Sequence, residues 1–342
     1  MKKQWILVLA LVLGLVMVFA GCAKDEPAET PAPAPSEEPA EEETPAAEED
    51  ITIGFIPMTL NNEYFITMVN GAQQKADELG VTLEVQAGQQ HASAEEQLQI
   101  IENMITSGVD AICIVPSSSE GLLTALQKCE DAGIPVINLD TRLNPELLES
   151  SGLEPVPFIG TDNYSGAKLA GEYVVANLEE GTKMAILTGI EGQENAAHRR
   201  NGFYDVVEGT MEVVAEQSAE WEVDKGYTAT QNILQANPDI AFIFASNDGM
   251  AIGALRAIQE ANKQDSIQVI GFDAIGEALN LIKSGEMLGT VAQFPAEMGI
   301  QGVQAAVDAL NGATLEMNTD TGAKLITSEN VDDFMTYLEQ FK

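Results

Sequence analysis

The sequence is poor in positive charge, in histidine and in cysteine. It contains 16 Lys and Arg residues against 54 Asp and Glu residues, and its formal net charge is -38 at pH 7. A surface this acidic repels nucleic-acid phosphates and anionic lipid headgroups, so the composition argues against nucleic-acid binding. The two histidines, His91 and His198, lie far apart in sequence, and no CxxC or Cys/His cluster indicates a metal site. We therefore expect neither a metal nor a cofactor.

Cysteine occurs three times, at Cys22, Cys113 and Cys129. Cys113 lies in the apolar run 111–115, and Cys129 follows Leu126 by three residues on a helical pattern. Both are expected to be small buried core residues. A disulfide between them stays open, because it requires a strand and a helix to meet with suitable geometry.

The N-terminal residues have the order basic, apolar, small, cysteine. Two lysines precede the apolar run 5–20, which is shorter than the ~20 residues that a helix needs to span a bilayer. This order resembles a bacterial lipoprotein signal peptide over residues 1–21, which implies a lipid on Cys22 and attachment to the membrane through it. An uncleaved transmembrane anchor is the alternative. Either reading places residues 51–342 outside the cytoplasmic membrane.

Residues 22–50 have the composition of a tether. From residue 23 onward they carry 11 acidic residues against a single base, Lys24, together with several prolines and few apolar residues. Such a segment buries too little surface to offset its ordering entropy, so we expect it to be disordered and extended. It would hold a folded domain clear of a membrane; an acidic tail that binds a partner is the alternative.

The remaining chain alternates strand and helix patterns. In its first part the predicted strands are residues 51–57, 81–85, 111–115 and 135–139. Apolar residues at helical spacing lie between these strands, and the helices end near Gly80, Gly108 and Ala132. Ser93 and Glu96 form a capping box for the second helix. This alternation predicts a parallel sheet with helices on both faces.

The same alternation restarts after residue 160. The predicted strands there are residues 183–187, 211–215, 240–244, 268–271 and 289–292. We therefore expect an α/β protein with two Rossmann-like parallel-sheet units. Ligands bind beyond the carboxyl ends of strands in such sheets, so two facing units would form a cleft between those ends.

Planar polar groups and aromatic rings follow nearly every predicted strand. The candidate binding residues are Asn62, Tyr64, Phe65, Asp140, Arg142, Asn195, Arg199, Trp221, Asn247, Asp273 and Gln293. Carboxylates accept hydrogen bonds, guanidinium groups donate them and amides do both, so together they can satisfy a ring of hydroxyls. The apolar C–H faces of a sugar pack on flat aromatic rings. The mixture indicates a site for a neutral sugar.

Several of these segments carry a resemblance to a known family. They are Thr59-Leu60-Asn61-Asn62 with Tyr64-Phe65, and residues 160–163, 244–255, 269–273 and 292–293. From about residue 51 to 330 the chain is similar to the periplasmic ribose- and galactose-binding proteins of bacterial ABC importers. The resemblance implies a type I periplasmic binding protein, in which two lobes close on a monosaccharide, a pentose or hexose. It also implies an ABC permease as partner, no enzymatic activity and a monomer.

The resemblance divides the folded part into two lobes. It places three crossings of the chain near residues 160, 294 and 323, which together form a three-segment hinge. The first lobe would comprise residues 51–160 and 294–323, and the second lobe residues 161–293 and 324–342.

The resemblance also gives the candidate residues their roles. Asn62 would hydrogen-bond the sugar from the first lobe, Tyr64 and Phe65 would form an aromatic wall, and Asp140 would bind a pair of hydroxyls. Trp221 falls where the ribose binder has a second stacking aromatic. Its neighbours Glu220 and Glu222 are acidic, a context that favours ligand contact over a core position.

The remaining candidates lie in the second lobe and at a crossing. Asn247, Asp273 and Gln293 match sugar-binding positions directly, whereas Asn195 and Arg199 resemble the loop of the galactose binder. At two positions where the ribose binder has arginine, this chain has Thr141 and Ala197. Arg142 and Arg199 lie close to these positions in the sequence. The calcium loop of the galactose binder has no counterpart here.

These residues also bear on other function classes. A glycosidase could use Asp140 and Asp273 as paired carboxylates, but neighbouring Asn and Arg favour their ionised state, whereas a general acid needs a raised pKa. No motif arranges a Ser-His or Cys-His nucleophile. A repressor of this fold needs a DNA-binding headpiece, which the signal peptide replaces. A receptor for a surface sensor, or for a polar non-sugar molecule such as an autoinducer, remains the alternative.

Overall fold

The computed structural model describes residues 50–89 and 94–342. The predicted signal peptide, the lipidation site Cys22, nearly all of the acidic tether, and His91 and Ser93 lie outside the described residues.

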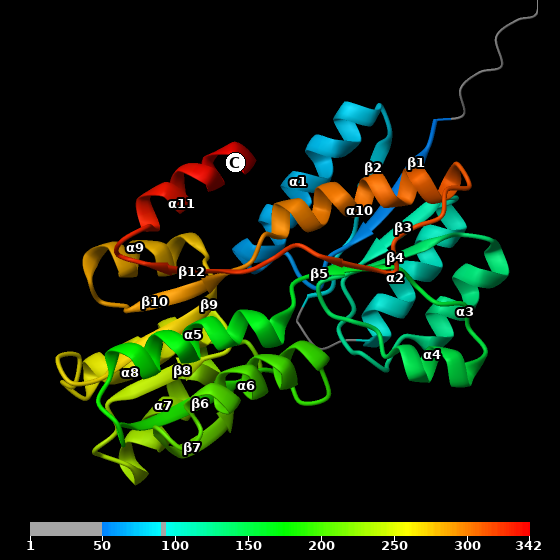
Figure 1. Ribbon diagram of the computed structural model, residues 1–342. Helices are drawn as coiled ribbons and strands as arrows, with labels where there is room; N and C mark the ends of the chain where they lie inside the picture. Colours follow the sequence, from blue (N-terminus) through cyan, green and yellow to red (C-terminus); the bar gives the residue numbers. More distant parts are fainter. Residues whose placement is uncertain (1–49, 90–93) are drawn as a thin grey trace, which may run out of the picture. The chain divides into compact units, whose positions relative to one another are not determined.

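Strands and helices alternate along the described chain up to α10, after which β11 and β12 follow one another (Figure 1). Up to the first change of sheet they are β1 (Thr52–Ile56), α1 (Glu63–Leu79), β2 (Thr82–Val85), α2 (Ala94–Ser107), β3 (Ala111–Ile114), α3 (Leu123–Ala132), β4 (Val136–Leu139), α4 (Pro145–Ser151) and β5 (Phe158–Gly160). The next stretch comprises α5 (Asn163–Asn177), β6 (Lys183–Thr188), α6 (Glu194–Val207), β7 (Glu212–Ser218), α7 (Val223–Ala236), β8 (Phe242–Ala245), α8 (Asp248–Glu260), β9 (Gln268–Asp273), α9 (Gly276–Ser284) and β10 (Gly289–Ala292). The last are α10 (Pro295–Leu310), β11 (Asn318–Asp320), β12 (Lys324–Thr327), α11 (Val331–Leu338) and the short η1 (Glu339–Phe341).

The strands form two six-stranded sheets. The first has the order β11-β5-β4-β3-β1-β2 and the second β12-β10-β9-β8-β6-β7. We call each sheet with its helices a lobe. The chain changes sheets after β5, after β10 and again between β11 and β12, so three segments connect the lobes. The predicted α/β fold of two parallel-sheet lobes is confirmed.

Each sheet is buried on both faces, as its apolar strands require. In the first lobe, α1 and α10 cover one face and α2, α3 and α4 the other. In the second, α7, α8, α9 and α11 cover one face and α5 and α6 the other. Helices α1 and α10 pack side by side because Gly71 and Gly299 leave room for the opposing backbone; a Cβ at Gly71 would lie 2.2 Å from the Ala296 carbonyl oxygen.

The structure corrects three details of the predicted strands. The short strands β5, β11 and β12 have no distinct sequence pattern, and β12 pairs with β10 in the antiparallel direction. Strand β7 continues to Ser218, beyond the predicted end at residue 215. Most helix ends agree with the sequence, because Gly80 and Gly133 adopt the left-handed conformation that ends a helix.

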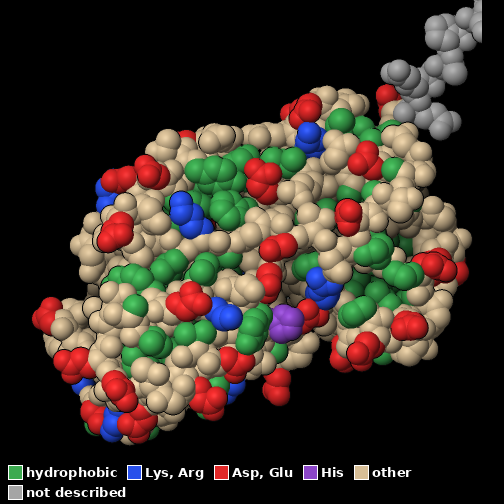
Figure 2. Space-filling view, in the orientation of Figure 1, with side chains coloured by type: hydrophobic (Ala, Val, Ile, Leu, Met, Phe, Trp, Pro, Cys, Tyr) green, Lys and Arg blue, Asp and Glu red, His purple; other side chains and the backbone are tan. Residues whose placement is uncertain are grey.

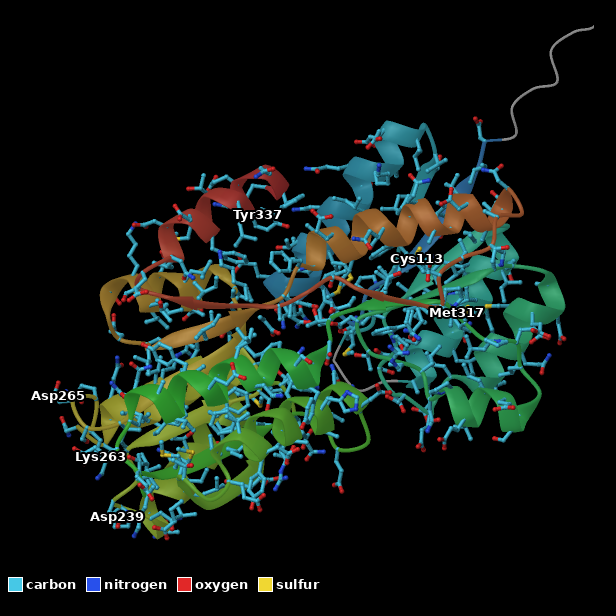
Figure 3. All side chains as sticks on the ribbon, in the orientation of Figure 1. Cys113, Asp239, Lys263, Asp265, Met317 and Tyr337 are labelled. Carbon is cyan, nitrogen blue, oxygen red and sulfur yellow. The ribbon has the colours of Figure 1, made fainter. Side chains whose placement is uncertain are left out.

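The two thiols are separate. Cys113 and Cys129 are buried and free, and they lie in apolar clusters on opposite faces of the first sheet. Figure 3 labels Cys113 inside the first lobe. Burial raises the pKa of Cys129 to about 11, so both residues serve as core packing and the disulfide left open by the sequence is absent.

The surface reflects the composition. Figure 2 shows acidic side chains spread over the visible face, with few basic side chains between them. Within the described residues, no helix combines the length and apolar content that a membrane crossing requires.

Candidate functional site

A small cavity lies where the carboxyl ends of both sheets meet. It is lined by Met58, Asn62, Tyr64, Phe65, Asp140, Asn195, Arg199, Trp221, Asn247, Asp273 and Gln293 and has a volume of about 30 Å³. Ten of these residues were predicted from the sequence. Larger grooves of about 520 and 550 Å³ border residues 153–156 on the first lobe, but their linings are mainly apolar. This cavity holds ten of the eleven candidates, and a neighbouring polar space of about 240 Å³ shares Asp140 and Asn195 with it.

Two helix starts place cavity residues in the two lobes. Asn62 caps α1, and its side-chain oxygen accepts a hydrogen bond from the Tyr64 amide at 3.0 Å. Asn247 caps α8 and accepts from the Met250 amide at 2.9 Å, while its own amide group donates to the Trp221 carbonyl at 3.2 Å. Capping fixes the direction of each asparagine next to the cavity.

The second-lobe wall centres on a buried ion pair. Arg199 donates from Nη1 to Asp273 Oδ1 at 3.1 Å and to the Ser246 carbonyl at 2.8 Å, and from Nε to Asn163 Oδ1 at 2.7 Å. Its guanidinium carbon lies 4.0 Å from the centre of the Phe272 ring. These bonds and the stacking hold the arginine in one orientation.

Asp273 accepts a second hydrogen bond, from Gln293 Nε2 at 2.8 Å. Burial raises the pKa of Asp273 to about 6, although Arg199 and the Gln293 amide lower it. The polar neighbours favour the ionised state, as expected from the sequence, but desolvation outweighs them, so the pKa is raised where we expected it not to be. The other end of the glutamine, Gln293 Oε1, is buried and has no hydrogen-bond partner among the described residues.

The first-lobe wall is more apolar. The Tyr64 hydroxyl donates to Asp140 Oδ1 at 2.7 Å, and burial together with this carboxylate raises the pKa of Tyr64. Tyr64 therefore stays protonated as a donor. Phe65 packs edge-on against Tyr64, with ring centres 5.1 Å apart. Met58, which the sequence reasoning missed, completes this wall; its position shortly after β1 is the only signal that could have pointed to it.

Three cavity residues have backbone conformations that L-amino acids rarely adopt. The φ angles of Asp140, Trp221 and Asp273 are 60°, 68° and 112°. Left-handed backbone at non-glycine residues costs on the order of 1–3 kcal/mol and occurs preferentially at functional sites. The strain therefore supports a functional role for this cavity.

Trp221 differs from its prediction. It lines the cavity, but it is only 7% exposed and belongs to an apolar cluster of the second lobe. Glu220 is exposed, so acidic neighbours do not keep the indole ring out of the core. Its ring lies so close to Gly189 that a Cβ there would approach it to 1.9 Å. The prediction that Trp221 is not a core residue was wrong, because the ring packs on both the core and the cavity.

Arg142 is the one candidate outside this cavity. Its guanidinium stacks on Phe158 at 4.0 Å, and its Nε lies 3.3 Å from Oε1 of Glu194 in the second lobe. It lines a neighbouring space of about 240 Å³ at the crossing segments instead. Two acidic residues in the matching segments, neither of them a binding candidate, have structural partners: Asp162 caps α5, and Asp248 is buried between Thr290 and the Ile275 amide.

The lobes touch each other around the cavity. The Gly276 amide donates to Glu63 Oε2 at 3.1 Å, and the Glu194 amide donates to Ser119 Oγ at 3.2 Å. The structure is thus a closed form, with less free space than the roughly 300–1,000 Å³ of most small-molecule sites.

Comparison with known proteins agrees with this geometry. The family described as "Periplasmic binding protein domain" matches residues 53–314. This chain belongs to that family. The D-ribose/D-allose-binding protein of Pseudomonas aeruginosa is 36% identical over 81% of this chain and 88% of its own length. The ribose import binding protein RbsB of Escherichia coli is 35% identical over 81% of this chain and 91% of its own length.

Solved structures of the family have the same architecture. An ABC transporter solute-binding protein from Actinobacillus succinogenes with bound D-allose superposes with a TM-score of 0.79 and 34% identity, covering 83% of this chain and 99% of that one. This family comprises solute-binding proteins of transport systems and not enzymes.

Proposed function

We propose that this protein is the substrate-binding component of an ABC sugar importer, and that the interlobe cavity binds one monosaccharide. The observation that carries the proposal is the cavity lining itself. Ten planar polar or aromatic side chains, predicted from the sequence as sugar ligands, converge there from both sheets. The unpartnered Gln293 Oε1 offers an acceptor for a hydroxyl group.

The binding mode follows from the two walls. Asp140 and Asp273 would accept hydrogen bonds from hydroxyls, Arg199 and Asn247 would donate, and Tyr64, Phe65 and Trp221 would pack on the C–H faces of the ring. Arg142 is left out of this set because it lies outside the cavity. The relatives named above bind ribose or allose, which supports a pentose or hexose as ligand.

Closure would couple binding to transport. Because the cavity of the closed form is small, a sugar must enter while the lobes are apart, and its contacts with both walls then favour the closed state. We assign residues 51–160 and 294–323 to the first lobe and residues 161–293 and 324–342 to the second. The pairing of β11 with β5 and of β12 with β10 supports this division. A permease would recognise the closed pair of lobes.

The N-terminal segment would anchor the protein. We propose that Cys22 carries a lipid and that residues 22–50 form the tether, because the basic, apolar and small residues precede a cysteine and an acidic stretch. Cys22→Ser should move the protein from the membrane fraction into soluble extracts or the medium. Firm membrane attachment of that variant would favour an uncleaved helix.

A thermal-shift screen tests the ligand class. A ligand that binds only the folded state raises the melting temperature by mass action. The screen should include pentoses, hexoses, deoxysugars, inositols and furanose-type autoinducers. We expect at least one pentose or hexose to raise the melting temperature of the parent protein and not that of Asp273→Ala. If only the autoinducers raise the melting temperature, the ligand is not a sugar and the alternative ligand class is supported.

A further inference from the structure

Gln193 links the side chain of Trp221, in its own lobe, to the backbone of the first lobe. It lies in the loop between β6 and α6, and its side chain is 2% exposed. Its Oε1 accepts a hydrogen bond from Trp221 Nε1 at 2.7 Å, and its Nε2 donates to the carbonyl of Ser117 in the first lobe at 2.8 Å. An indole N–H only donates and a carbonyl only accepts, so these partners fix the orientation of the amide.

The first-lobe partner is held firmly. The side chain of Gln97, which is 1% exposed, accepts from the Ser117 amide at 2.7 Å and donates to the Val115 carbonyl at 2.7 Å. Gln97 thereby fixes the loop that follows β3. The Ser117 carbonyl is a preformed acceptor that the second lobe meets only when the lobes are together.

The Trp221 side of the connection lies within the second lobe. The ring of Trp221 lies against Gly189, and its backbone carbonyl accepts from Asn247. Gln193 and Trp221 are on the same lobe, so the hydrogen bond between them survives when the lobes separate. The hydrogen bond to Ser117 does not, because it crosses from one lobe to the other.

We propose that Gln193 is a positioning residue: it sets the orientation of the Trp221 ring before the ligand arrives and completes its second hydrogen bond upon closure. This inference rests on the proposed function. The orientation of Trp221 in the cavity would then depend on a residue that does not line the cavity. It would also depend on lobe closure.

Fluorescence provides a direct readout. The chain has two tryptophans, Trp5 and Trp221, so Trp5→Phe in the full chain leaves emission from Trp221 alone. In that background we compare Gln193→Met, which removes both hydrogen bonds, with Gln193→Glu, which keeps an acceptor for the indole but places a negative charge against the Ser117 carbonyl. The ligand is the sugar that gives the largest thermal shift in the screen.

The two variants should behave differently. Gln193→Glu should keep the parental emission without sugar and bind the sugar about tenfold more weakly, since the hydrogen bond to Ser117 is lost. Gln193→Met should change the emission without sugar and weaken binding at least as much. Ser119→Ala, which removes another hydrogen bond between the lobes, should leave the emission without sugar unchanged. Parental emission and affinity in both Gln193 variants would overturn the inference.

A double-mutant cycle tests whether Gln193 acts through the tryptophan. Trp221→Phe removes the indole N–H but keeps an aromatic ring. The loss of affinity caused by Gln193→Met should be smaller in the Trp221→Phe protein than in the parent. Strictly additive losses would contradict the inference even if the sugar binds. If the parent binds no sugar at all, the proposed function fails first. If Gln193→Met does not fold, parental affinity in Gln193→Glu would still overturn the inference.

Discussion

The two walls of the cavity differ in how their side chains are held. In the second lobe, Arg199, Asp273 and Gln293 are joined by hydrogen bonds into one buried network, with Trp221 beside them. In the first lobe, Asp140 accepts hydrogen bonds from the hydroxyls of Tyr64 and Thr141, and Phe65 and Met58 complete the wall. The second lobe therefore presents a preorganised polar surface, and the first lobe presents a largely apolar cover.

We therefore expect the two lobes to contribute differently to ligand binding. A preorganised network loses little entropy on binding, so most of the hydrogen-bond energy should come from the second lobe. The apolar cover excludes water when the lobes close and thereby strengthens those hydrogen bonds. Substitutions in the two walls should accordingly differ in their effect on the stability of the free protein.

The largest effect is expected from Asp273→Ala. It leaves the buried guanidinium of Arg199 without its carboxylate, and removing one partner of a buried pair costs about 3–5 kcal/mol. Both the free energy of unfolding and the affinity should fall, the affinity by roughly 100-fold or more. Chemical denaturation and calorimetric titration measure the two quantities.

Two controls sharpen this comparison. Asp140→Ala is the matched first-lobe change and should weaken binding while costing less stability. Asp265→Ala changes an exposed acid on the turn between α8 and β9, at the outer end of the second lobe (Figure 3), and should change neither. An equal loss of stability in Asp140→Ala and Asp273→Ala would contradict the difference between the walls.

Trp221→Ala should have the next largest effect on binding. Removing an aromatic hot spot weakens binding by about 2 kcal/mol or more. Because the ring also packs in the core, the free energy of unfolding without sugar should fall by about 3–5 kcal/mol as well. Trp221→Phe should recover much of the stability. If Trp221→Ala lowers the free energy of unfolding strongly but leaves the affinity unaltered, Trp221 is only a core residue and does not contact the ligand.

Acid should weaken binding through Asp273. Its folded-state pKa is raised from 3.8 to about 6, so between these values the folded protein without sugar binds more protons than the unfolded chain. The contribution of Asp273 to stability therefore falls as the pH rises from about 4 to 6. Sugar hydroxyls need the ionised carboxylate, so the affinity should fall about tenfold between pH 7.5 and 5. Titrations of the parent and Asp273→Asn test this, and the same pH dependence in both would contradict it.

The smallest effect is expected from Arg142→Gln. The ion pair with Glu194 joins the two lobes, but both side chains remain 29% exposed. Pairs of this kind contribute about 0–1 kcal/mol, so the affinity should fall only a few-fold, and more at low than at high salt. A loss as large as that of Asp273→Ala would return Arg142 to the ligand set.

The sequence determines the strand ends, and most of the site follows from them. Asp140 follows β4, Asn247 lies two residues after β8 and Asp273 ends β9, and parallel strands bring their carboxyl ends to one edge. Strands β5 and β11 escaped prediction because three residues carry too little periodicity, and exposed residues interrupt the apolar pattern of β11 and β12.

The predictions about site residues that were wrong concern properties that tertiary contacts determine. Burial of Trp221 depends on Gly189 and on helices α7 and α8, none of which its acidic neighbours reveal. Arg142 lies two residues from Asp140, yet stacking on Phe158 turns it towards Glu194. The raised pKa of Asp273 reflects desolvation, which follows from the packing of two lobes and not from the sequence around the residue.

Solution scattering with and without the sugar tests the central claim most directly, because the claim is that ligand closes the lobes around this cavity. The radius of gyration of the parent should fall when the sugar is saturating, and that of Asp273→Ala should not change at the same concentration. If the parent binds the sugar without any change in the radius of gyration, or if Asp273→Ala binds and contracts like the parent, the interlobe cavity is not the site of a closing clamp.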